Sequence, residues 1–244
     1  MLKAAGIKLA QEIPKGASVL DVGGGFSPFP RANWVIDLMD FNHRYSNPLE
    51  SKFPVHYSKE TWVQRDICDR TPWPFRDKEF DFSTCSHLLE DVRDPIWVCA
   101  ELIRVSKAGY IEVPSRIEEQ SLGVENPRYA GYYHHRWLVD KIGSNTLEFR
   151  LKPHSLHSMR DAIVAKVGPC SRIRSEHAIL SMHWNGEFKA IEIQEASERK
   201  VNDELCDLAQ RSRAIPNLLE RTPMSIKQKV LRSIYYARLY LGLR

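Results

Sequence analysis

The chain has 244 residues, of which 43% are hydrophobic and 27% charged. This composition excludes a disordered chain and indicates one α/β domain with additions, or at most two small domains. The formal net charge of +4 is too small to predict nucleic-acid binding. The five cysteines include no C-x-x-C spacing, so reduced thiols and a cytoplasmic location are expected. The N-terminus is too polar for a signal peptide, and no apolar run approaches the roughly 20 residues of a membrane span.

The first 114 residues alternate short apolar strands with helical patterns. A helix is expected over 3–13, before Pro14. A second helix is expected from Pro95 to about residue 106, because Asp94 suits an N-cap and proline suits the first helical position. The expected strands are 18–22, 34–38, 61–64, 80–84 and 110–113. This alternation predicts a mostly parallel sheet with helices on both faces.

The pattern changes after Pro114. Residues 115–146 hold few apolar runs and are expected to form an insertion. Asn185-Gly186 predicts a hairpin between strands 178–184 and 187–193. The other expected elements are a strand at 147–151 and helices at 159–167, 197–213 and 224–241.

The most informative motif is the run of three glycines that follows the first strand. Asp21 lies within that strand, and Gly23, Gly24 and Gly25 let the backbone turn sharply and approach a ligand. The third glycine of a dinucleotide motif is missing, because Phe26-Ser27-Pro28 follows. Backbone amides at such a turn can bind the carboxylate of an amino acid.

Two further acidic residues end the next two strands. Asp37, followed by Leu38, ends the second strand, where a carboxylate can accept both hydroxyls of a ribose. Asp66 ends the third and can accept a hydrogen bond from an adenine amino group, while Ile67 packs on the ring. The alternatives are an exposed strand-end acid for Asp37 and an ordinary turn aspartate for Asp66.

The fourth strand leads into Ser86-His87-Leu88-Leu89-Glu90-Asp91. This run resembles the segment of class I S-adenosylmethionine-dependent methyltransferases, type 11-like, that usually reads His-x-Leu-Glu-His. Asp91 stands where the second histidine is common. The resemblance covers about residues 15–114 and implies a Rossmann-like sheet of seven strands in the order 3-2-1-4-5-7-6, with the Asn185-Gly186 hairpin giving the last two.

The resemblance also implies S-adenosylmethionine as the cofactor and assigns its contacts. The residues that it places around the cofactor are Asp21, Gly23, Gly24 and Gly25 (methionine part), Asp37 (ribose), Asp66 and Ile67 (adenine), and Ser86 and His87 (sulfonium). Leu38 is also expected to contact the cofactor. A hydroxyl acceptor needs a base, for which His87 is the first candidate and Asp91 the second. The alternative for His87 is a structural histidine bonded to backbone.

The insertion contains a dense group of aromatic and cationic side chains. The expected acceptor-binding residues are Tyr132, His134, His135, Arg136 and Trp137. Such residues can stack on a sugar face or bind a phosphate or carboxylate; the alternative is a small core beneath a long loop. No metal is expected, because His134, His135, His154 and His157 match no zinc spacing.

Together these features predict a methyltransferase domain over 1–195, with a substrate lid at about 115–146, and a helical extension over 196–244. The predicted acceptor is a small molecule or a carbohydrate hydroxyl, as in surface polysaccharide or glycoconjugate synthesis. A nicotinamide- or nucleotide-sugar-dependent enzyme and a non-catalytic scaffold with the same fold are the alternatives. The expected oligomeric state is a monomer or homodimer. The basic helix at 224–241 suits packing or dimerisation better than contact with a membrane surface.

Overall fold

The computed structural model describes residues 1, 3–45, 47–157, 167, 171–195, 197–221 and 234. The chain forms two compact units. Unit 1 consists of Met1–Val113, Lys141–Phe149 and Ser181–Glu192. Unit 2 consists of Pro114–Asp140, Arg150–Leu180 and Ile193–Arg244. The predicted boundary near residue 195 stays a prediction.

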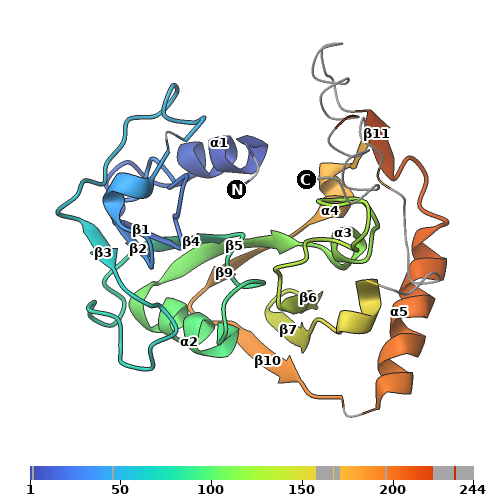
Figure 1. Ribbon diagram of the computed structural model, residues 1–244. Helices are drawn as coiled ribbons and strands as arrows, with labels where there is room; N and C mark the ends of the chain where they lie inside the picture. The colour runs from blue at the N-terminus through green and yellow to red at the C-terminus, as the bar shows by residue number, and fades with distance from the viewer. Residues whose placement is uncertain are drawn as a thin grey trace. The chain divides into compact units, whose positions relative to one another are not determined.

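The main sheet has six strands in the order β3-β2-β1-β4-β5-β9 (Figure 1). Its strands are β1 (Val19–Val22), β2 (Trp34–Asp37), β3 (Trp62–Gln64), β4 (Phe82–Ser86), β5 (Ala108–Pro114) and β9 (Ile179–Asn185). The pairs from β3 to β5 are parallel. The predicted mostly parallel sheet is therefore confirmed, but it has six strands in place of the expected seven, with β9 next to β5.

Two helices flank this sheet, α1 (Lys3–Glu12) and α2 (Pro95–Val105), and Figure 1 shows them on opposite faces. α2 begins as predicted, with the Asp94 side chain accepting a hydrogen bond from the Trp97 N–H. All four residues of β1 are buried, which is why the sequence there shows a continuous apolar run interrupted only by Asp21. Because β1 runs parallel to its neighbours β2 and β4, the carboxyl ends of these three strands lie at the same edge of the sheet.

The expected hairpin around Asn185-Gly186 is wrong. β10 (Lys189–Ile193) does not pair beside β9 but joins β7 (Thr146–Leu151) and β6 (Trp137–Ile142) in a second sheet of order β10-β7-β6. Gly186 has a φ of +76°, and the N–H of Glu187 donates back to the carbonyl of Asn185 at 3.0 Å. This tight turn sends the chain away from β9, so β9 takes the place next to β5 where 187–193 was expected.

The remaining described elements lie mainly in unit 2. They are η1 (Phe41–His43, in unit 1), α3 (Arg116–Glu119), η2 (His154–His157), β8 (Ser171–Ile173), α4 (Ser175–Ala178), α5 (Glu198–Ser212) and β11 (Leu219–Arg221). α5 confirms the helix predicted over 197–213. The helices predicted over 159–167 and 224–241 lie outside the described residues, apart from residues 167 and 234. Of the helices that the structure describes, none is both long and apolar enough to cross a membrane.

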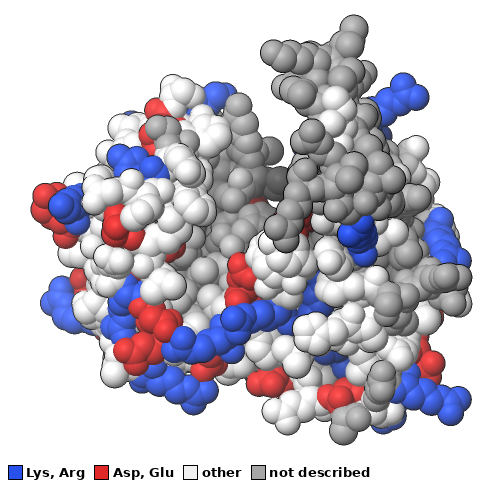
Figure 2. All heavy atoms as spheres, in the orientation of Figure 1, with Lys and Arg blue, Asp and Glu red and all other residues white. Residues whose placement is uncertain are grey.

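Acidic and basic side chains adjoin one another on the face shown in Figure 2. Within unit 1, Arg70 pairs with Asp94 at 2.6 Å and Lys107 with Asp81 at 2.7 Å. Because such exposed pairs contribute only about 0–1 kcal/mol each, they set the surface charge rather than the stability of the unit.

Candidate active site

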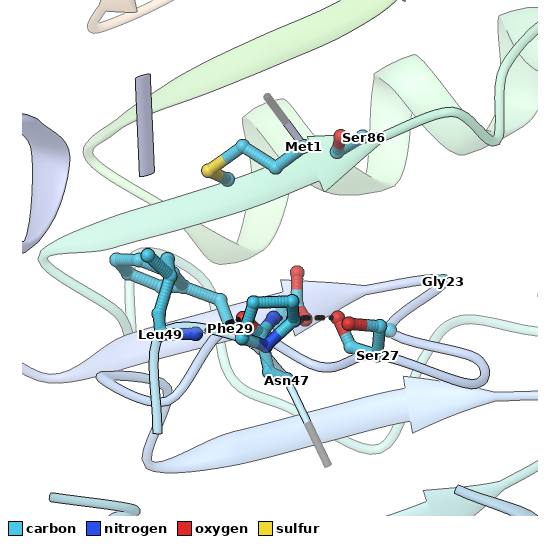
Figure 3. Close-up of a pocket in the computed structure, with 10 residues that line it drawn as sticks. Met1, Gly23, Ser27, Phe29, Asn47, Leu49 and Ser86 are labelled. Atoms are coloured by element: carbon cyan, nitrogen blue, oxygen red, sulfur yellow. Dashed lines mark hydrogen bonds between the residues drawn. The ribbon is translucent and has the colours of Figure 1, made fainter. Parts of the chain in front are cut away.

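A cavity lies at the carboxyl edge of the main sheet, within unit 1. It is lined by Met1, Asp21, Gly23, Gly24, Ser27, Phe29, Asn47, Pro48, Leu49 and Ser86. Figure 3 shows Ser27, Phe29, Asn47 and Leu49 on one side of this cavity and Met1 and Ser86 on the other. Four of the residues predicted to contact the cofactor, Asp21, Gly23, Gly24 and Ser86, thus line the cavity.

The glycine turn, residues 23–25, follows β1 at this edge of the sheet. Gly23 has a φ of +72° and Gly25 a φ of +49°, a backbone conformation that residues with a side chain rarely adopt. A Cβ on Gly23 would come within 2.5 Å of Leu88 Cδ2, and one on Gly24 within 2.9 Å of Asp21 Oδ2. The turn therefore requires glycine at positions 23 and 24.

Asp21 is buried and held from two sides. Its Oδ1 accepts a hydrogen bond from Thr84 Oγ1 at 2.6 Å, and its Oδ2 accepts one from the Phe29 N–H at 2.8 Å. Burial raises the pKa of Asp21 to about 6, although both hydrogen bonds favour the ionised form. At neutral pH this carboxylate places a negative charge beside the cavity.

Asp37 joins the end of β2 to the glycine turn. Its Oδ2 accepts a hydrogen bond from the Gly25 N–H at 2.8 Å, and its Oδ1 accepts one from the Met39 N–H at 2.7 Å. Burial raises the pKa of Asp37 above its usual range. The next residue, Leu38, is 66% exposed, which is unusual for leucine at a sheet edge and leaves an apolar surface beside the carboxylate.

Asp66 and Ile67 follow β3. Asp66 Oδ1 accepts a hydrogen bond from the Cys68 N–H at 2.9 Å, and its Oδ2 is 2.6 Å from Arg93 Nη1. These two contacts lower the pKa of Asp66. Ile67 is buried, and its carbonyl accepts a hydrogen bond from Trp73 Nε1 at 3.1 Å. Neither residue lines the cavity, so their adenine contacts stay predictions.

His87 lies between two buried carboxylates. Its Nε2 is 3.2 Å from Glu112 Oε1, and its Nδ1 is 3.5 Å from Glu90 Oε1. Burial alone would lower the pKa of His87, but the adjacent carboxylates of Glu112 and Glu90 outweigh it and raise the pKa to about 9. His87 also has a φ of +53°, which is uncommon for a residue with a side chain and is typical of functional sites.

The role of His87 as a base stays a prediction, and the geometry favours an imidazolium that holds its proton at neutral pH. Asp91, the second candidate, is half-buried, and its N–H donates to the carbonyl of Leu88 at 2.9 Å. Ser86 Oγ donates to Glu112 Oε1 at 3.3 Å. The residues predicted to lie near the sulfonium therefore form one network around Glu112.

The other side of the cavity is closed by the long connection after β2, in which no site residue was predicted. Asn47 Nδ2 donates hydrogen bonds to the carbonyls of Ser27 and Pro28, at 3.0 and 2.8 Å. These contacts fasten the long connection after β2 to the glycine turn. Its length of about twenty residues was a signal of function, but nothing in the sequence distinguished Asn47 or Leu49 within it.

Three of the residues predicted to bind the acceptor, all in unit 2, lie against one another: Tyr132, His134 and His135. Tyr132 and His135 stack with ring centroids 4.5 Å apart, and Tyr132 OH donates to Glu118 Oε1 at 2.9 Å. His134 lies against His135, with ring centroids 4.5 Å apart. Arg136 is exposed, whereas Trp137 is buried as the first residue of β6.

Part of the chain is similar to known proteins. Residues 20–111 match the family model of the methyltransferase domain. No curated protein matches the chain. Solved structures similar to part of the chain include an S-adenosylmethionine-dependent methyltransferase from Mesorhizobium loti, at 18% identity and a TM-score of 0.35, covering 60% of this chain and 63% of that one. Another is an S-adenosylmethionine-dependent methyltransferase from Aquifex aeolicus, at 20% identity and a TM-score of 0.34, covering 46% of this chain and 64% of that one.

Residues 20–111, less than half of the chain, are therefore similar to a methyltransferase domain. The chain spans less than two thirds of the length of these two solved structures.

The described residues of unit 1 fit the cofactor of this family. Gly23 and Gly24 line the cavity, Asp37 offers acceptors at the end of β2, and Asp21 supplies a negative charge beside the cavity.

Proposed function

We propose that the protein transfers a methyl group from S-adenosylmethionine to a hydroxyl of a small molecule or carbohydrate. The observation that supports this most strongly is the cavity bounded by Asp21, the glycine turn and Ser86, within the segment that matches the methyltransferase domain. When bound, the cofactor supplies a methyl group on a sulfonium, which is already a good leaving group. The protein then has mainly to hold the acceptor in line with the methyl carbon.

The contacts of unit 1 suggest how the cofactor would be held. Gly23, Gly24 and Asp21 would face its methionine part, and Asp37, which lies close to the turn through Gly25, would accept the ribose hydroxyls. Leu38 would cover one face of the adenine with its exposed side chain, and Asp66 with Ile67 would bind the other part of that ring. Ser86 and His87 would lie beside the sulfonium.

The acceptor would be bound by unit 2. Tyr132, His134, His135, Arg136 and Trp137 are the proposed residues, of which Tyr132 and His135 already stack on one another. Aromatic rings and a cationic side chain suit a sugar that carries a phosphate or carboxylate. This supports a role in the synthesis of surface polysaccharides or glycoconjugates. The protein would act in the cytoplasm as a monomer or homodimer.

Calorimetry and a transfer assay test this function. We expect heat of binding with S-adenosylhomocysteine and none with NADH. Radiolabelled S-adenosylmethionine is then offered with methyl α-glucoside, methyl α-mannoside or methyl α-rhamnoside as hydroxyl acceptors, and with ethanolamine as an amine. Label on a glycoside supports the proposal, and label on ethanolamine alone moves the acceptor class to amines. Binding of NADH without S-adenosylhomocysteine would overturn the proposal.

A further inference from the structure

Two buried carboxylates flank the imidazole of His87 in unit 1, and their surroundings differ. Glu112 and Glu90 are 0% and 1% exposed. Glu112 is surrounded by donors: Tyr110 OH donates to its Oε2 at 2.7 Å, Ser86 Oγ donates to its Oε1 at 3.3 Å, and His87 Nε2 is 3.2 Å from the same Oε1. The carboxylate of Glu112 is therefore well compensated within the fold.

Glu90 lacks such surroundings. Its Oε1 is 3.5 Å from His87 Nδ1, and neither of its oxygens accepts a hydrogen bond from a residue that the structure describes. Buried carboxylates are normally hydrogen-bonded or closely paired, because an isolated buried charge is costly. The position of Glu90 therefore favours a role in binding a cation over a role in folding.

His87, Glu90 and Glu112 form what we call the His87 cluster, and this cluster adjoins the cavity of unit 1. Ser86 lines the cavity and donates to Glu112, and Figure 3 shows Ser86 on the same side of the cavity as Met1. The N–H of His87 donates to the carbonyl of Glu112 at 2.8 Å, which fixes the cluster to the end of β5. The cluster therefore lies next to the wall of the cavity that Ser86 forms.

The charges of the cavity and the His87 cluster leave one negative charge in excess. The carboxylates are Asp21, Glu90 and Glu112, and the cationic groups are His87 and the Met1 ammonium, which is 3.6 Å from Glu112 Oε1. S-adenosylmethionine carries a sulfonium, an ammonium and a carboxylate, so it has one net positive charge, whereas S-adenosylhomocysteine has none. An excess of negative charge in a cleft favours a cationic ligand, so this balance suits the methyl donor.

We propose that Glu90 is the counter-ion of the sulfonium and that the His87 cluster is the part of the cavity that binds this cation. This rests on the proposed function, which puts Ser86 and His87 beside the sulfonium. Each cationic group of the donor then has a carboxylate of its own, Asp21 for the ammonium and Glu90 for the sulfonium. A sulfonium has no N–H or O–H to donate, so it pairs through charge alone and suits a carboxylate without hydrogen-bond donors.

His87 holds Glu90 in place for this role. Two buried carboxylates repel each other, and the imidazole lies between them with one nitrogen toward each. One positive charge cannot compensate two negative charges. Glu90 is the more distant carboxylate, at 3.5 Å against 3.2 Å for Glu112, so more of its attraction is left for a ligand.

Calorimetry with two ligands tests this assignment. Sinefungin carries an ammonium on the carbon that replaces the methylated sulfur and so represents the cationic donor, whereas S-adenosylhomocysteine is uncharged at that position. Glu90→Gln removes the carboxylate charge and keeps the shape of the side chain. We expect its affinity for sinefungin to fall roughly ten- to hundredfold, with the affinity for S-adenosylhomocysteine nearly unchanged.

Two further variants control for charge and for position. Glu90→Asp keeps the charge on a shorter side chain and should retain part of the preference for sinefungin. Glu60→Gln makes the same chemical change at an exposed carboxylate of unit 1, whose Oε2 accepts a hydrogen bond from Ser58 Oγ at 2.6 Å. It should leave both affinities as in the wild type.

Thermal unfolding without ligand separates a binding role from a structural one. The amide of Glu90→Gln replaces a buried charge that lacks donors, so we expect unfolding at the wild-type temperature or above it. A carboxylate that served the fold alone would instead give a lower unfolding temperature and an unchanged ratio of the two affinities.

The ratio of the two affinities decides the outcome. An unchanged ratio in Glu90→Gln would overturn the proposal. An equal loss for both ligands would also overturn it, because the ammonium that they share would then be the partner of Glu90. If Glu90→Gln does not fold, the ratio in Glu90→Asp decides instead. If the wild type binds neither ligand, the proposed function itself fails.

Discussion

The imidazole of His87 and the carboxylate of Glu112 shift each other's pKa in opposite directions across 3.2 Å. Burial opposes both charges, yet their hydrogen bond prevails: the pKa of His87 is raised to about 9 and that of Glu112 is lowered to about 2. The pair therefore holds the end of β4 to β5 as a charged unit at neutral pH.

The stability of the protein should depend on pH through this pair. The contribution of His87 is complete below its ordinary pKa of about 6.5 and is lost as the pH rises through 9. The contribution of Glu112 is complete above its ordinary pKa of about 4.5 and is lost as the pH falls through 2. Because His87 is 38% exposed, solvent screening reduces the expected loss between pH 6.5 and pH 9 to about 1–2 kcal/mol.

Urea unfolding at pH 6.5 and pH 9 measures this effect. His87→Gln should remove most of the difference between the two pH values, whereas His43→Gln, at a side chain that is 67% exposed, should keep it. An equal loss of stability between pH 6.5 and pH 9 in the wild type and in His87→Gln would contradict the assignment.

Gly23→Ala should destabilise the protein by about 2–4 kcal/mol. The alanine would have to adopt a φ of +72°, and its Cβ would press on Leu88 at 2.5 Å. Gly16→Ala is the control, because a Cβ there meets nothing within 4 Å. Denaturant unfolding of both variants checks the prediction, which a similar loss at the two positions would refute.

Asp37→Asn should weaken both the fold and the binding of S-adenosylhomocysteine. Each oxygen of Asp37 accepts a backbone N–H, so an amide NH2 must face one of these donors, at a cost of about 1–3 kcal/mol. Calorimetry should show at least a roughly tenfold weaker Kd, which corresponds to about 1.4 kcal/mol. Asp40→Asn, in an exposed hydrogen bond to the Asn42 N–H, should bind as the wild type does. Wild-type affinity in Asp37→Asn would argue against a ribose contact there.

Asn47→Ala should loosen the side of the cavity opposite Ser86. It removes two hydrogen bonds that Nδ2 donates to the carbonyls of Ser27 and Pro28 and one that Oδ1 accepts from the Leu49 N–H, each contributing about 1 kcal/mol. We expect a several-fold weaker affinity for S-adenosylhomocysteine by calorimetry. The exposed Asn42→Ala is the matched control; a loss of affinity in both variants would mean that the effect is not specific to Asn47.

The part of the site that could be predicted from the sequence is local. Asp21, Gly23 and Ser86 lie at the ends of adjacent parallel strands, and in such a sheet these ends meet at one edge. These three residues, assigned from their place on a strand, therefore line the cavity, whereas Asp37 and Asp66, assigned in the same way, do not. Asp94 likewise marked the start of α2, because an N-cap acts within a few residues.

Contacts over long sequence distances could not be predicted in this way. Asn47 reaches Ser27 across twenty positions, and Lys152 reaches Glu119 across thirty-three. Neither pair shares an element, so periodicity and capping say nothing about them. The hairpin prediction at Asn185-Gly186 was wrong for a related reason. A tight turn determines a change of chain direction, but tertiary packing determines which strand the next strand pairs with. Here β10 pairs with β7.

The buried carboxyl of Asp21, with its pKa of about 6, has a consequence for how substrate and product compete. The methyl donor is a sulfonium cation, whereas the spent product is an uncharged thioether. Mild acidification neutralises Asp21 and so removes its attraction for the ammonium group, which donor and product share, and for the sulfonium, which only the donor carries. Product inhibition should therefore grow stronger as the medium moves from pH 7 to pH 5, although neither molecule changes its own charge at sulfur.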